Sequence, residues 1–376
     1  MSNIYKIVVD GTVLAMALDN KLARTGVYFV IKNLCDSLIK RKDVELKIFS
    51  SVVLKKKLLN YYRGHRYEKC LNTDDLKPGI EKLNFLFPFH PPNSDILKFS
   101  NSNFFQIIYD FSAHMCAELK KNNIAFEKRI IETLKSKIHP ICISEQTKKD
   151  LANISKIPLN DIGVFYPGLR HELYNFDNRN LNYSNDNINT FLKIPNNAKY
   201  LLCLSTIEPR KNLNSSLRVF KKIFEILKSQ DLYLVLTGAK GWGSEENFFK
   251  DLPNEIKKKI ILTGYVNDEM VSKLYKSSLC FLYPSFYEGF GLPPLEAIAC
   301  GTPIIVSNRG SLPEIFNSVA EVFDPYDIDG MASVIINWFL NPNERVIQVK
   351  KSKNFTKNFT WNNSANQLMK YISSFE

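Results

Sequence analysis

Short apolar runs alternate with segments of helical spacing along most of the chain. The predicted strands are Ile4–Asp10, Val44–Ser50, Phe104–Asp110, Ile138–Ser144, Ile162–Tyr166, Lys199–Ser205, Leu232–Thr237, Lys259–Thr263, Leu279–Tyr283 and Pro303–Ser307. Between them, apolar residues recur every three or four positions, as in Val27–Leu38 and Leu213–Leu227. Strands that alternate with helices in this way predict parallel sheets of the α/β class.

Other segments show neither periodicity. Residues 11–26 are predicted to form a loop, and Asn84–Pro92, with three prolines, a loop after a short strand. Residues 171–198 are rich in Asn, Asp and Tyr and predict a linker. Ser144 is expected to cap a helix that begins at Glu145, and Thr360 to cap the last helix.

A chain of 376 residues is long for one hydrophobic core and natural for two domains. The alternation of strands and helices occurs twice, with a break near residue 170. We therefore expect two Rossmann-like domains, each a doubly wound parallel sheet, facing a cleft. The expected bounds are 1–170 for the first domain, 171–198 for the linker and 199–358 for the second.

The composition is that of an ordinary soluble protein, with 45% hydrophobic and 23% charged residues. No apolar run reaches the roughly 18 residues that a membrane span needs. The start of the chain has no basic-then-apolar signal peptide. The seven cysteines include no C-x-x-C pair, and we interpret them as reduced, buried thiols of a cytoplasmic protein.

The net charge of +12 is unevenly placed. Residues 1–170 hold 27 Lys and Arg against 17 Asp and Glu, whereas residues 171–376 hold 23 against 21. This asymmetry indicates either a solvated basic surface or a first half that approaches something anionic, such as a membrane surface, a lipid diphosphate or a nucleic acid. No nucleic-acid-binding motif is present, so we expect no nucleic-acid partner.

One stretch of the first half, residues 55–66, interleaves lysines and arginines with leucines and tyrosines. At helical spacing this pattern is typical of a helix that lies on an anionic membrane surface. An ordinary amphipathic helix packed on the sheet would show the same pattern, and the sequence leaves both interpretations open.

The chemistry concentrates in Leu282–Ser307, which reads LYPSFYEGFGLPPLEAIACGTPIIVS. A strand is followed by a loop with two glycines and then by a helix. The first N–H groups of a helix lack partners within it, so such a start favours phosphate. Glu288 in the loop and Glu296, expected in the first turn, are acceptors that suit hydroxyl groups. The loop therefore predicts a site for a nucleotide-sugar, although Glu296 alone could be a favourable first-turn charge.

A second loop, after Lys199–Ser205, carries two adjacent cations, Arg210 and Lys211. An arginine can hold two phosphate oxygens, and a lysine acts as a point charge. The alternative is a surface charge pair. We prefer a diphosphate site because the carboxyl ends of parallel strands meet at one edge of the sheet, where the Glu288 loop also starts.

The stretch around these residues resembles the signature of family 4 retaining glycosyltransferases, which have the GT-B fold and two glutamates eight positions apart. The resemblance extends over most of Leu201–Pro325, in LSTIEPRKNL, LVLTGAKGW and ILTGYVNDE, and is weaker in the first half. It implies a retaining hexosyltransferase of polysaccharide or lipopolysaccharide biosynthesis. It also implies that the helix of residues 359–376 crosses back to the first domain.

The resemblance implies a role for particular residues. Arg210 and Lys211 would hold the pyrophosphate, Glu288 the sugar hydroxyls and Glu296 the ribose. The donor-binding candidates of the family type are Gly26, Gly238, Tyr265, Val266, Gly289, Phe290, Gly291 and Leu292. Gly26 could equally be a structural turn glycine, and Tyr265 could simply pack.

On the acceptor side the chain departs from the family. A histidine–aspartate pair is common at the end of the corresponding strand; here Tyr109 stands in the histidine position and Asp110 is kept. His114, on a loop nearby, is an acceptor-side candidate or a solvated side chain. At Ser205 some members have a further arginine, so one cationic contact is absent.

No catalytic metal or cofactor is expected. Asp327-Ile328-Asp329 resembles a metal-binding D-x-D motif, but helix capping explains it better. The partners implied are a nucleotide-sugar (GDP-mannose, UDP-hexose or dTDP-rhamnose) and a glycan or lipid-linked glycan acceptor. Two alternatives stay open: a GT-B nucleotide-sugar epimerase, and a non-catalytic partner subunit of a glycosyltransferase.

Overall fold

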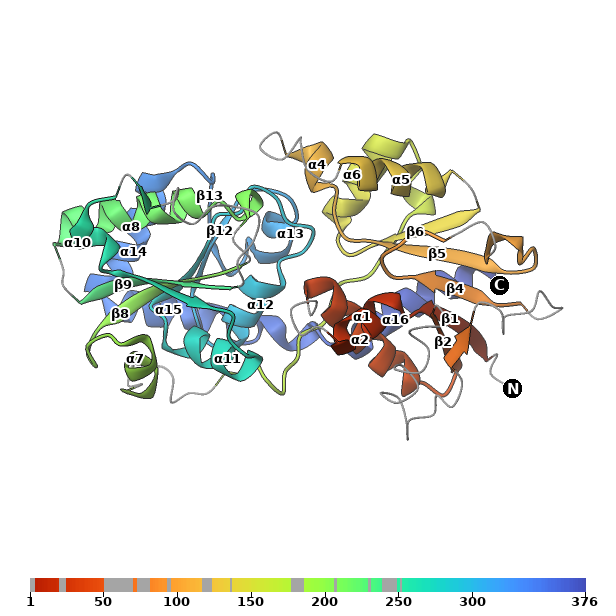
Figure 1. Cartoon of the computed structure of the whole chain (residues 1–376), viewed down its shortest axis with the longest axis horizontal. Coiled ribbons are helices and arrows are strands. Elements are labelled where there is room, and N and C mark those ends of the chain that lie inside the picture. The colour runs from red at the N-terminus through yellow and green to blue at the C-terminus, as the bar shows by residue number, and fades with distance from the viewer. Residues whose placement is uncertain are drawn as a thin grey trace. The chain divides into compact units, whose positions relative to one another are not determined.

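The computed structural model divides the chain into two compact units (Figure 1). The first unit comprises Met1–Met115, Lys121–Gly168 and Phe359–Glu376, and the second Cys116–Lys120 and Leu169–Asn358. The structure describes residues 4–19, 25–50, 70–72, 82–92, 96–116, 124–135, 137–176, 186–205, 208–228, 231–238, 249–250 and 252–376.

The first unit contains a seven-stranded parallel sheet in the order β3-β2-β1-β4-β5-β6-β7. Its strands are β1 (Tyr5–Asp10), β2 (Val44–Ser50), β3 (Cys70–Asn72), β4 (Asn84–Phe87), β5 (Asn103–Ile108), β6 (Ile138–Cys142) and β7 (Gly163–Val164). Its helices are α1 (Thr12–Asp19), α2 (Gly26–Ile39), α4 (Ser112–Met115), α5 (Ile124–Leu134), α6 (Glu145–Ser155) and α16 (Trp361–Ile372).

The second unit contains a six-stranded parallel sheet in the order β10-β9-β8-β11-β12-β13. Its strands are β8 (Lys199–Leu204), β9 (Leu232–Thr237), β10 (Ile260–Gly264), β11 (Cys280–Tyr283), β12 (Ile304–Ser307) and β13 (Glu321–Phe323). Its helices are α7 (Asp186–Leu192), α8 (Leu213–Leu227), α10 (Asn254–Lys257), α11 (Asp268–Ser277), α12 (Leu292–Ala299), α13 (Leu312–Phe316), α14 (Ile328–Leu340) and α15 (Pro342–Ser352).

In both sheets the order in which successive strands are added reverses at the first strand of the unit. Counted within each unit, the order 3-2-1-4-5-6 is that of a Rossmann fold, with one additional strand, β7, in the first unit. The predicted Rossmann-like architecture of both domains is confirmed. In such sheets ligands bind outside the carboxyl ends of the strands where the order reverses, which in the second unit is between β8 and β11.

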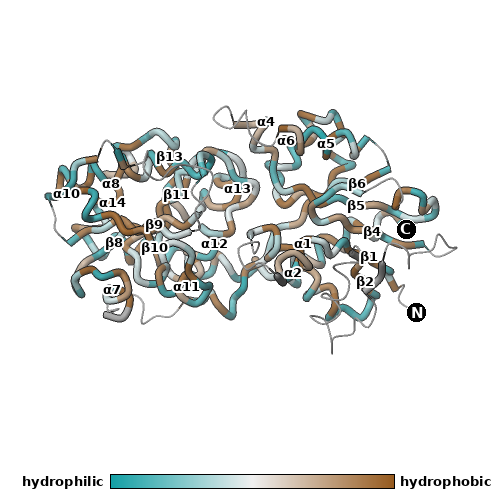
Figure 2. Tube along the Cα trace, in the orientation of Figure 1, coloured by the Kyte–Doolittle hydropathy of each residue, from teal (hydrophilic) through white to brown (hydrophobic). Residues whose placement is uncertain are grey.

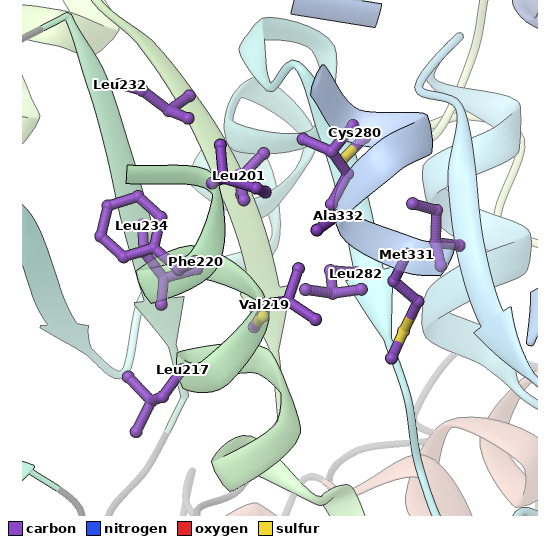
Figure 3. Packing of buried hydrophobic residues seen from close by; sticks show 14 of the residues in the cluster. Leu201, Leu217, Val219, Phe220, Leu232, Leu234, Cys280, Leu282, Met331 and Ala332 are labelled. Carbon is purple, nitrogen blue, oxygen red and sulfur yellow. The ribbon is translucent and has the colours of Figure 1, made fainter. Parts of the chain in front are cut away.

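The core of the second unit lies between its sheet and helices α8 and α14 (Figure 3). Phe220 of α8 and Met331 of α14 pack with Leu201 of β8 and Leu282 of β11, and all four are fully or almost fully buried. The 15 residues of α8 are strongly amphipathic, which is why one face of the helix covers the sheet. Figure 2 shows hydrophobic residues along central strands such as β9.

The core of the first unit is rich in phenylalanine. The ring of Phe85 in β4 stacks on that of Phe104 in β5 and meets the edge of Phe99, with centroid distances of 5.4 and 5.2 Å. Phe85 is completely buried. These contacts hold β4 in the middle of the sheet, and because β4 pairs in parallel with β1 and β5 the carboxyl ends of the three strands form one edge.

Two segments predicted as loops in the first unit are regular structure. Within residues 11–26, α1 forms because residues 14–18 are all good helix formers, and Leu14, Ala15 and Ala17 are buried. Within Asn84–Pro92, residues 84–87 form β4. A strand buried on both faces reads as a continuous apolar run, so the alternation that marks a strand is absent.

In the region predicted as a linker, residues 171–198, helix α7 buries Ile188 and Leu192 and contacts α11. The predicted strand Ile162–Tyr166 is shortened to Gly163–Val164. The basic, aromatic stretch of residues 55–66 lies outside the described residues. The predicted caps are confirmed: the hydroxyls of Ser144 and Thr360 each accept an N–H three residues on.

The helix α16 packs against α2 and β7 of the first unit. The Oε1 of Gln367 accepts the N–H of Tyr166, and the hydroxyl of Tyr371 donates to the carbonyl of Asp161. A Cβ at Gly168 would lie 2.4 Å from the backbone nitrogen of Trp361, so glycine is required where the start of α16 meets the end of this unit.

Candidate functional site

The two loops that the sequence singled out meet at the carboxyl edge of the second sheet. Arg210 and Lys211 lie in the short 3-10 turn Pro209–Lys211 after β8, and Glu288 lies in the loop after β11. The two loops are tied together by the backbone, because the N–H of Phe286 donates to the carbonyl of Arg210 at 2.8 Å. The site occupies the point where the strand order reverses.

Glu288 is buried, and both of its carboxylate oxygens contact cations. Its Oε1 lies 2.7 Å from Nζ of Lys211 and 2.9 Å from the hydroxyl of Tyr283. Its Oε2 lies 2.8 Å from Nη1 of Arg210. Burial alone would raise the pKa of this carboxyl, but Arg210 and Lys211 lower it to about 2. Glu288 is therefore ionised at every pH at which the protein would be studied.

The two cations differ in their surroundings. Burial lowers the pKa of Lys211, Arg210 lowers it further, and Glu288 opposes the change. Nζ of Lys211 also contacts the hydroxyl of Tyr283 at 2.7 Å. The guanidinium of Arg210 is held on its other side by Glu208, with Nε at 3.1 Å and Nη2 at 2.8 Å from Oε1. The side chains are thus fixed in place before any ligand arrives.

Asn212 connects the loop that carries Arg210 and Lys211 to the loops that follow β11 and β13. It caps α8 in a left-handed conformation with φ 51°, and its Nδ2 donates to the carbonyls of Pro284 and Pro325. Asparagine adopts this conformation more readily than most residues, which accounts for its place here.

The glycine loop forms the N-terminus of α12, as predicted. Gly291 precedes the helix with φ 101°, and a Cβ there would lie 2.8 Å from Cδ2 of Leu312. Phe290 is buried, and the helix starts at Leu292 with two prolines in its first turn. Pro293 and Pro294 carry no N–H, so Leu292 is the only one of the first three residues of α12 that can donate one, and the turn before it has a backbone that only glycine adopts without strain.

Glu296 lies apart from the Glu288 cluster. It is the fifth residue of α12, so the expected place in the first turn is wrong, and a favourable first-turn charge does not explain it. Its Oε2 lies 3.4 Å from the hydroxyl of Tyr275, and its Oε1 lies 3.8 Å from Nη2 of Arg170. Burial raises the pKa of Glu296 to about 7, against the effect of Arg170.

The donor-binding candidates Gly238, Tyr265 and Val266 lie together at the ends of β9 and β10. The N–H of Gly238 donates to the carbonyl of Gly264 at 3.1 Å. Tyr265 follows with 54% of its surface exposed, which does not support the alternative that it simply packs, and Val266 is half-buried.

In the first unit, Tyr109 does not present its hydroxyl to solvent. The hydroxyl is buried and has no hydrogen-bond partner among the described residues. Burial, with a smaller effect of Cys35, raises its pKa. Asp110, the next residue, accepts the N–H of Ser112 at 3.1 Å.

His114 lies in the short helix α4, so its expected place on a loop is wrong. Its Nδ1 contacts Oε2 of Glu127, and the N–H groups of Ala113 and His114 also donate to this carboxylate, at 2.8 and 3.0 Å. The imidazole is thus oriented by a buried carboxylate, which the sequence did not single out.

Gly26 is the exposed first residue of α2. Its φ is not positive, and a Cβ there would meet nothing within 4 Å. Neither backbone strain nor packing within the protein requires glycine at this position.

The D-x-D motif of residues 327–329 caps a helix. The Oδ1 of Asp327 accepts the N–H of Gly330 at 2.9 Å, which confirms the capping interpretation, and Asp329 pairs with Lys222. Within the described residues no three His, Cys, Asp or Glu side chains are arranged to hold a metal ion. The six cysteines whose side chains the structure describes are buried and form no disulfide.

Two Rossmann-like units, each built on a parallel sheet, have the architecture of the GT-B fold. Residues 184–358 match the family described as Glycosyl transferases group 1. A sucrose-phosphate synthase from Thermosynechococcus elongatus has the same fold, with a TM-score of 0.71 at 15% identity over 99% of both chains.

Two curated relatives are similar to a little under half of the chain. The O-antigen chain mannosyltransferase B of Escherichia coli is 36% identical over 173 residues, which are 45% of this chain and 44% of that protein. The O-antigen chain mannosyltransferase RfbU of Salmonella typhimurium is 30% identical over 166 residues, 44% of this chain and 46% of that protein. The chain thus matches a little under half the length of these relatives.

Proposed function

We propose that this protein is a retaining glycosyltransferase that transfers a hexose from a nucleotide-diphospho-sugar to a glycan or lipid-linked glycan. The observation that carries the proposal is the convergence of Arg210, Lys211 and Glu288 at the switch point of the second sheet. The match of residues 184–358 to the glycosyl transferases group 1 family supports it.

The chemistry follows from the charge that develops in the reaction. Breaking the bond between the anomeric carbon and the diphosphate leaves negative charge on the leaving oxygen, so fixed cations aimed at it lower the barrier. Lys211 has three N–H donors, and the described contacts use two, to Glu288 and Tyr283. The third can bind a phosphate oxygen. The N–H of Leu292 at the start of α12 is a further donor; Pro293 and Pro294, which follow it, have none.

In this proposal the side chains position the reactants, and none acts as a nucleophile. The leaving phosphate oxygen takes the proton of the attacking hydroxyl, so retention of configuration needs no side-chain base. Holding both reactants in line then supplies much of the rate. Glu288 fixes the cations, Glu296 accepts hydrogen bonds from the ribose, and Tyr265 borders the nucleobase.

The sugar that we propose is mannose. The two relatives described above are named mannosyltransferases of O-antigen chains. GDP-mannose is therefore the first donor to test, followed by UDP-hexoses and dTDP-rhamnose. The nucleotide-sugar is a substrate, and we propose that neither a metal nor a cofactor takes part.

The acceptor that we propose is a lipid-linked glycan on the cytoplasmic face of a membrane, bound by the first domain. The charge difference between the two halves of the chain supports an anionic partner for that domain. None of the described helices is long and apolar enough to cross a bilayer.

The test is a melting-temperature screen with GDP-mannose, UDP-glucose and dTDP-rhamnose, because a ligand that binds only the folded state stabilises it. We expect one donor to raise the melting temperature and Lys211→Ala to abolish that rise. The exposed Lys222→Ala on α8 is the matched control and should keep it. If no nucleotide-sugar shifts the wild type, the proposed function is wrong.

A further inference from the structure

Arg170 contacts the donor-binding candidate Glu296, but the proposed function gives this arginine no role. It lies directly after Gly168 and Leu169, where the chain enters the second unit, and only 12% of its side chain is exposed. Its carbonyl accepts the N–H groups of Leu173 and Tyr174, both at 3.0 Å, so the segment folds into a tight turn. A buried arginine at such a place requires partners, and its partners belong to the Glu296 site.

The guanidinium of Arg170 contacts three side chains at once. Nη1 lies 2.6 Å from Oδ2 of Asp268, in the first turn of α11. Nη2 lies 3.1 Å from the hydroxyl of Tyr174 and 3.8 Å from Oε1 of Glu296. The guanidinium carbon also lies 5.3 Å from the centre of the Tyr174 ring. Asp268 and Tyr174 thus fix the guanidinium beside Glu296.

The other groups that face Glu296 do not stabilise its charge as Arg170 does. Tyr275 donates to Oε2 from a fully buried hydroxyl, and Tyr174 forms a further hydrogen bond to the carboxyl. Asp268 repels the charge, and the buried thiol of Cys300 lies one turn further along α12. Arg170 is the cation that lowers the pKa of Glu296 against the effect of burial.

We propose that Arg170 is a positioning residue that keeps Glu296 ionised and oriented, so that its carboxylate accepts hydrogen bonds from the 2′- and 3′-hydroxyls of a ribonucleotide donor. This inference rests on the proposed function. An ionised carboxylate can only accept hydrogen bonds, so both of its oxygens can bind the hydroxyl groups of the diol. A protonated carboxyl carries an O–H donor, which would face the O–H donors of the diol. Loss of Arg170 therefore weakens ribose recognition near neutral pH and leaves diphosphate recognition unchanged.

The proposal also distinguishes the candidate donors by whether their nucleotide carries ribose or 2′-deoxyribose. GDP and UDP carry both hydroxyls, whereas a 2′-deoxynucleotide lacks the one nearer the base. A carboxylate that binds a vicinal diol loses one charge-assisted hydrogen bond to a deoxynucleotide, which corresponds to about tenfold or more in affinity. The chain is therefore expected to favour GDP-linked or UDP-linked sugars over dTDP-linked ones.

The experiment compares GDP with 2′-deoxy-GDP, and UDP with 2′-deoxy-UDP, by calorimetry from pH 6 to 9. The variants are Arg170→Gln, Arg170→Lys and, as a matched loss of an exposed arginine, Arg218→Gln on α8. In the wild type we expect the preference for the ribonucleotide to weaken as the pH falls through about 7, because Glu296 gains a proton there. In Arg170→Gln this midpoint should rise by about one pH unit or more.

Four results separate the possibilities. A preference that is lost at pH 7 in Arg170→Gln, recovered at pH 9 and kept in Arg170→Lys and Arg218→Gln supports the proposal. An Arg170→Gln variant with the wild-type pH profile overturns it, as does equal weakening of ribonucleotide and deoxyribonucleotide at every pH. If the wild type binds none of the four nucleotides, the proposed function itself is wrong. Melting curves of each variant report whether it is folded.

Discussion

Nζ of Lys211 lies 2.7 Å from Oε1 of Glu288, although the residues come from loops after different strands. This ion pair is buried and is shared with Arg210 and Tyr283. A carboxylate that contacts two cations fixes their positions, and Glu208 holds Arg210 on its other side. Glu288 is therefore expected to act on a diphosphate through Arg210 and Lys211, in addition to any contact with the sugar.

Replacing Glu288 tests this relationship. We expect Glu288→Gln to weaken the binding of free GDP or UDP as well as that of the nucleotide-sugar, because both need the cations in place. If Glu288 contacted only the sugar, the nucleoside diphosphate would bind as in the wild type. Calorimetry with the nucleoside diphosphate and its mannose or glucose derivative separates the two outcomes.

The same variant should be less stable. Removing one partner of a buried ion pair leaves uncompensated charge and costs about 3–5 kcal/mol of unfolding free energy. Because the pKa of Glu288 is lowered to about 2 from an ordinary 4.5, this stabilisation is complete above pH 4.5 and is lost progressively as the pH falls towards 2. Urea unfolding of wild type and Glu288→Gln should differ more at pH 7 than at pH 3; an equal difference at both contradicts the assignment.

Replacing Lys211 should reduce the chemical step. Loss of a fixed group that stabilises the developing charge costs about 10²–10³ in kcat. We expect this loss in Lys211→Ala and no change in Lys222→Ala, which removes an exposed lysine that pairs with Asp329. Steady-state kinetics with a saturating donor measures it, and wild-type kcat in Lys211→Ala would rule out the diphosphate role.

Substitutions at Gly264 and Gly291 distinguish the stability cost of backbone strain from the cost of overpacking. Both Gly291 and Gly264 have positive φ, but a Cβ at Gly264 meets nothing whereas one at Gly291 would overlap Leu312 and Phe316. We expect Gly264→Ala to cost about 1–2 kcal/mol, and Gly291→Ala to cost about 1–3 kcal/mol more because of overpacking. Equal costs in unfolding experiments would show that the start of α12 relaxes freely.

Gly26 offers the converse test. Since neither φ nor packing requires glycine there, Gly26→Ala should leave stability within about 0.5 kcal/mol of the wild type. If the donor phosphates approach this backbone, as the family resemblance implies, the added methyl group should raise KM for the donor. An unchanged KM would remove Gly26 from the donor site.

Catalysis without a metal is tested by removing divalent cations. We expect activity to persist in excess chelator, because in this proposal Arg210, Lys211 and the start of α12 carry the stabilisation of the leaving group. Loss of activity in chelator with recovery on addition of manganese would contradict the proposal.

Much of this site could be predicted because strand ends in a parallel sheet share an edge. The sequence placed Arg210 and Lys211 after one apolar run and Glu288 after another, and the sheet order brings the two loops together. The sequence could not indicate Tyr283 or Arg170. Tyr283 looks like the last apolar residue of its strand, and Arg170 reaches Glu296 across 126 positions of the chain.

The sequence pattern predicted loops where α1 and β4 form, and the reason lies in the residues of these two segments. Helix α1 lies in a segment that begins with glycine, and β4 lacks the alternation by which half-buried strands are recognised. When a segment is buried on all sides, its hydrophobic residues show no periodicity from which a strand could be predicted. The structure of β4 then depends on the packing of its Phe85 against Phe99 and Phe104.

The return of α16 to the first unit means that this unit is assembled from segments separated by the entire second unit. During synthesis on the ribosome, β7 and α2 must wait for residues 361–372, and about 190 intervening residues can fold before those arrive. Until then the surface that α16 will cover is exposed to solvent, which makes the early half of the nascent chain a natural client for chaperones.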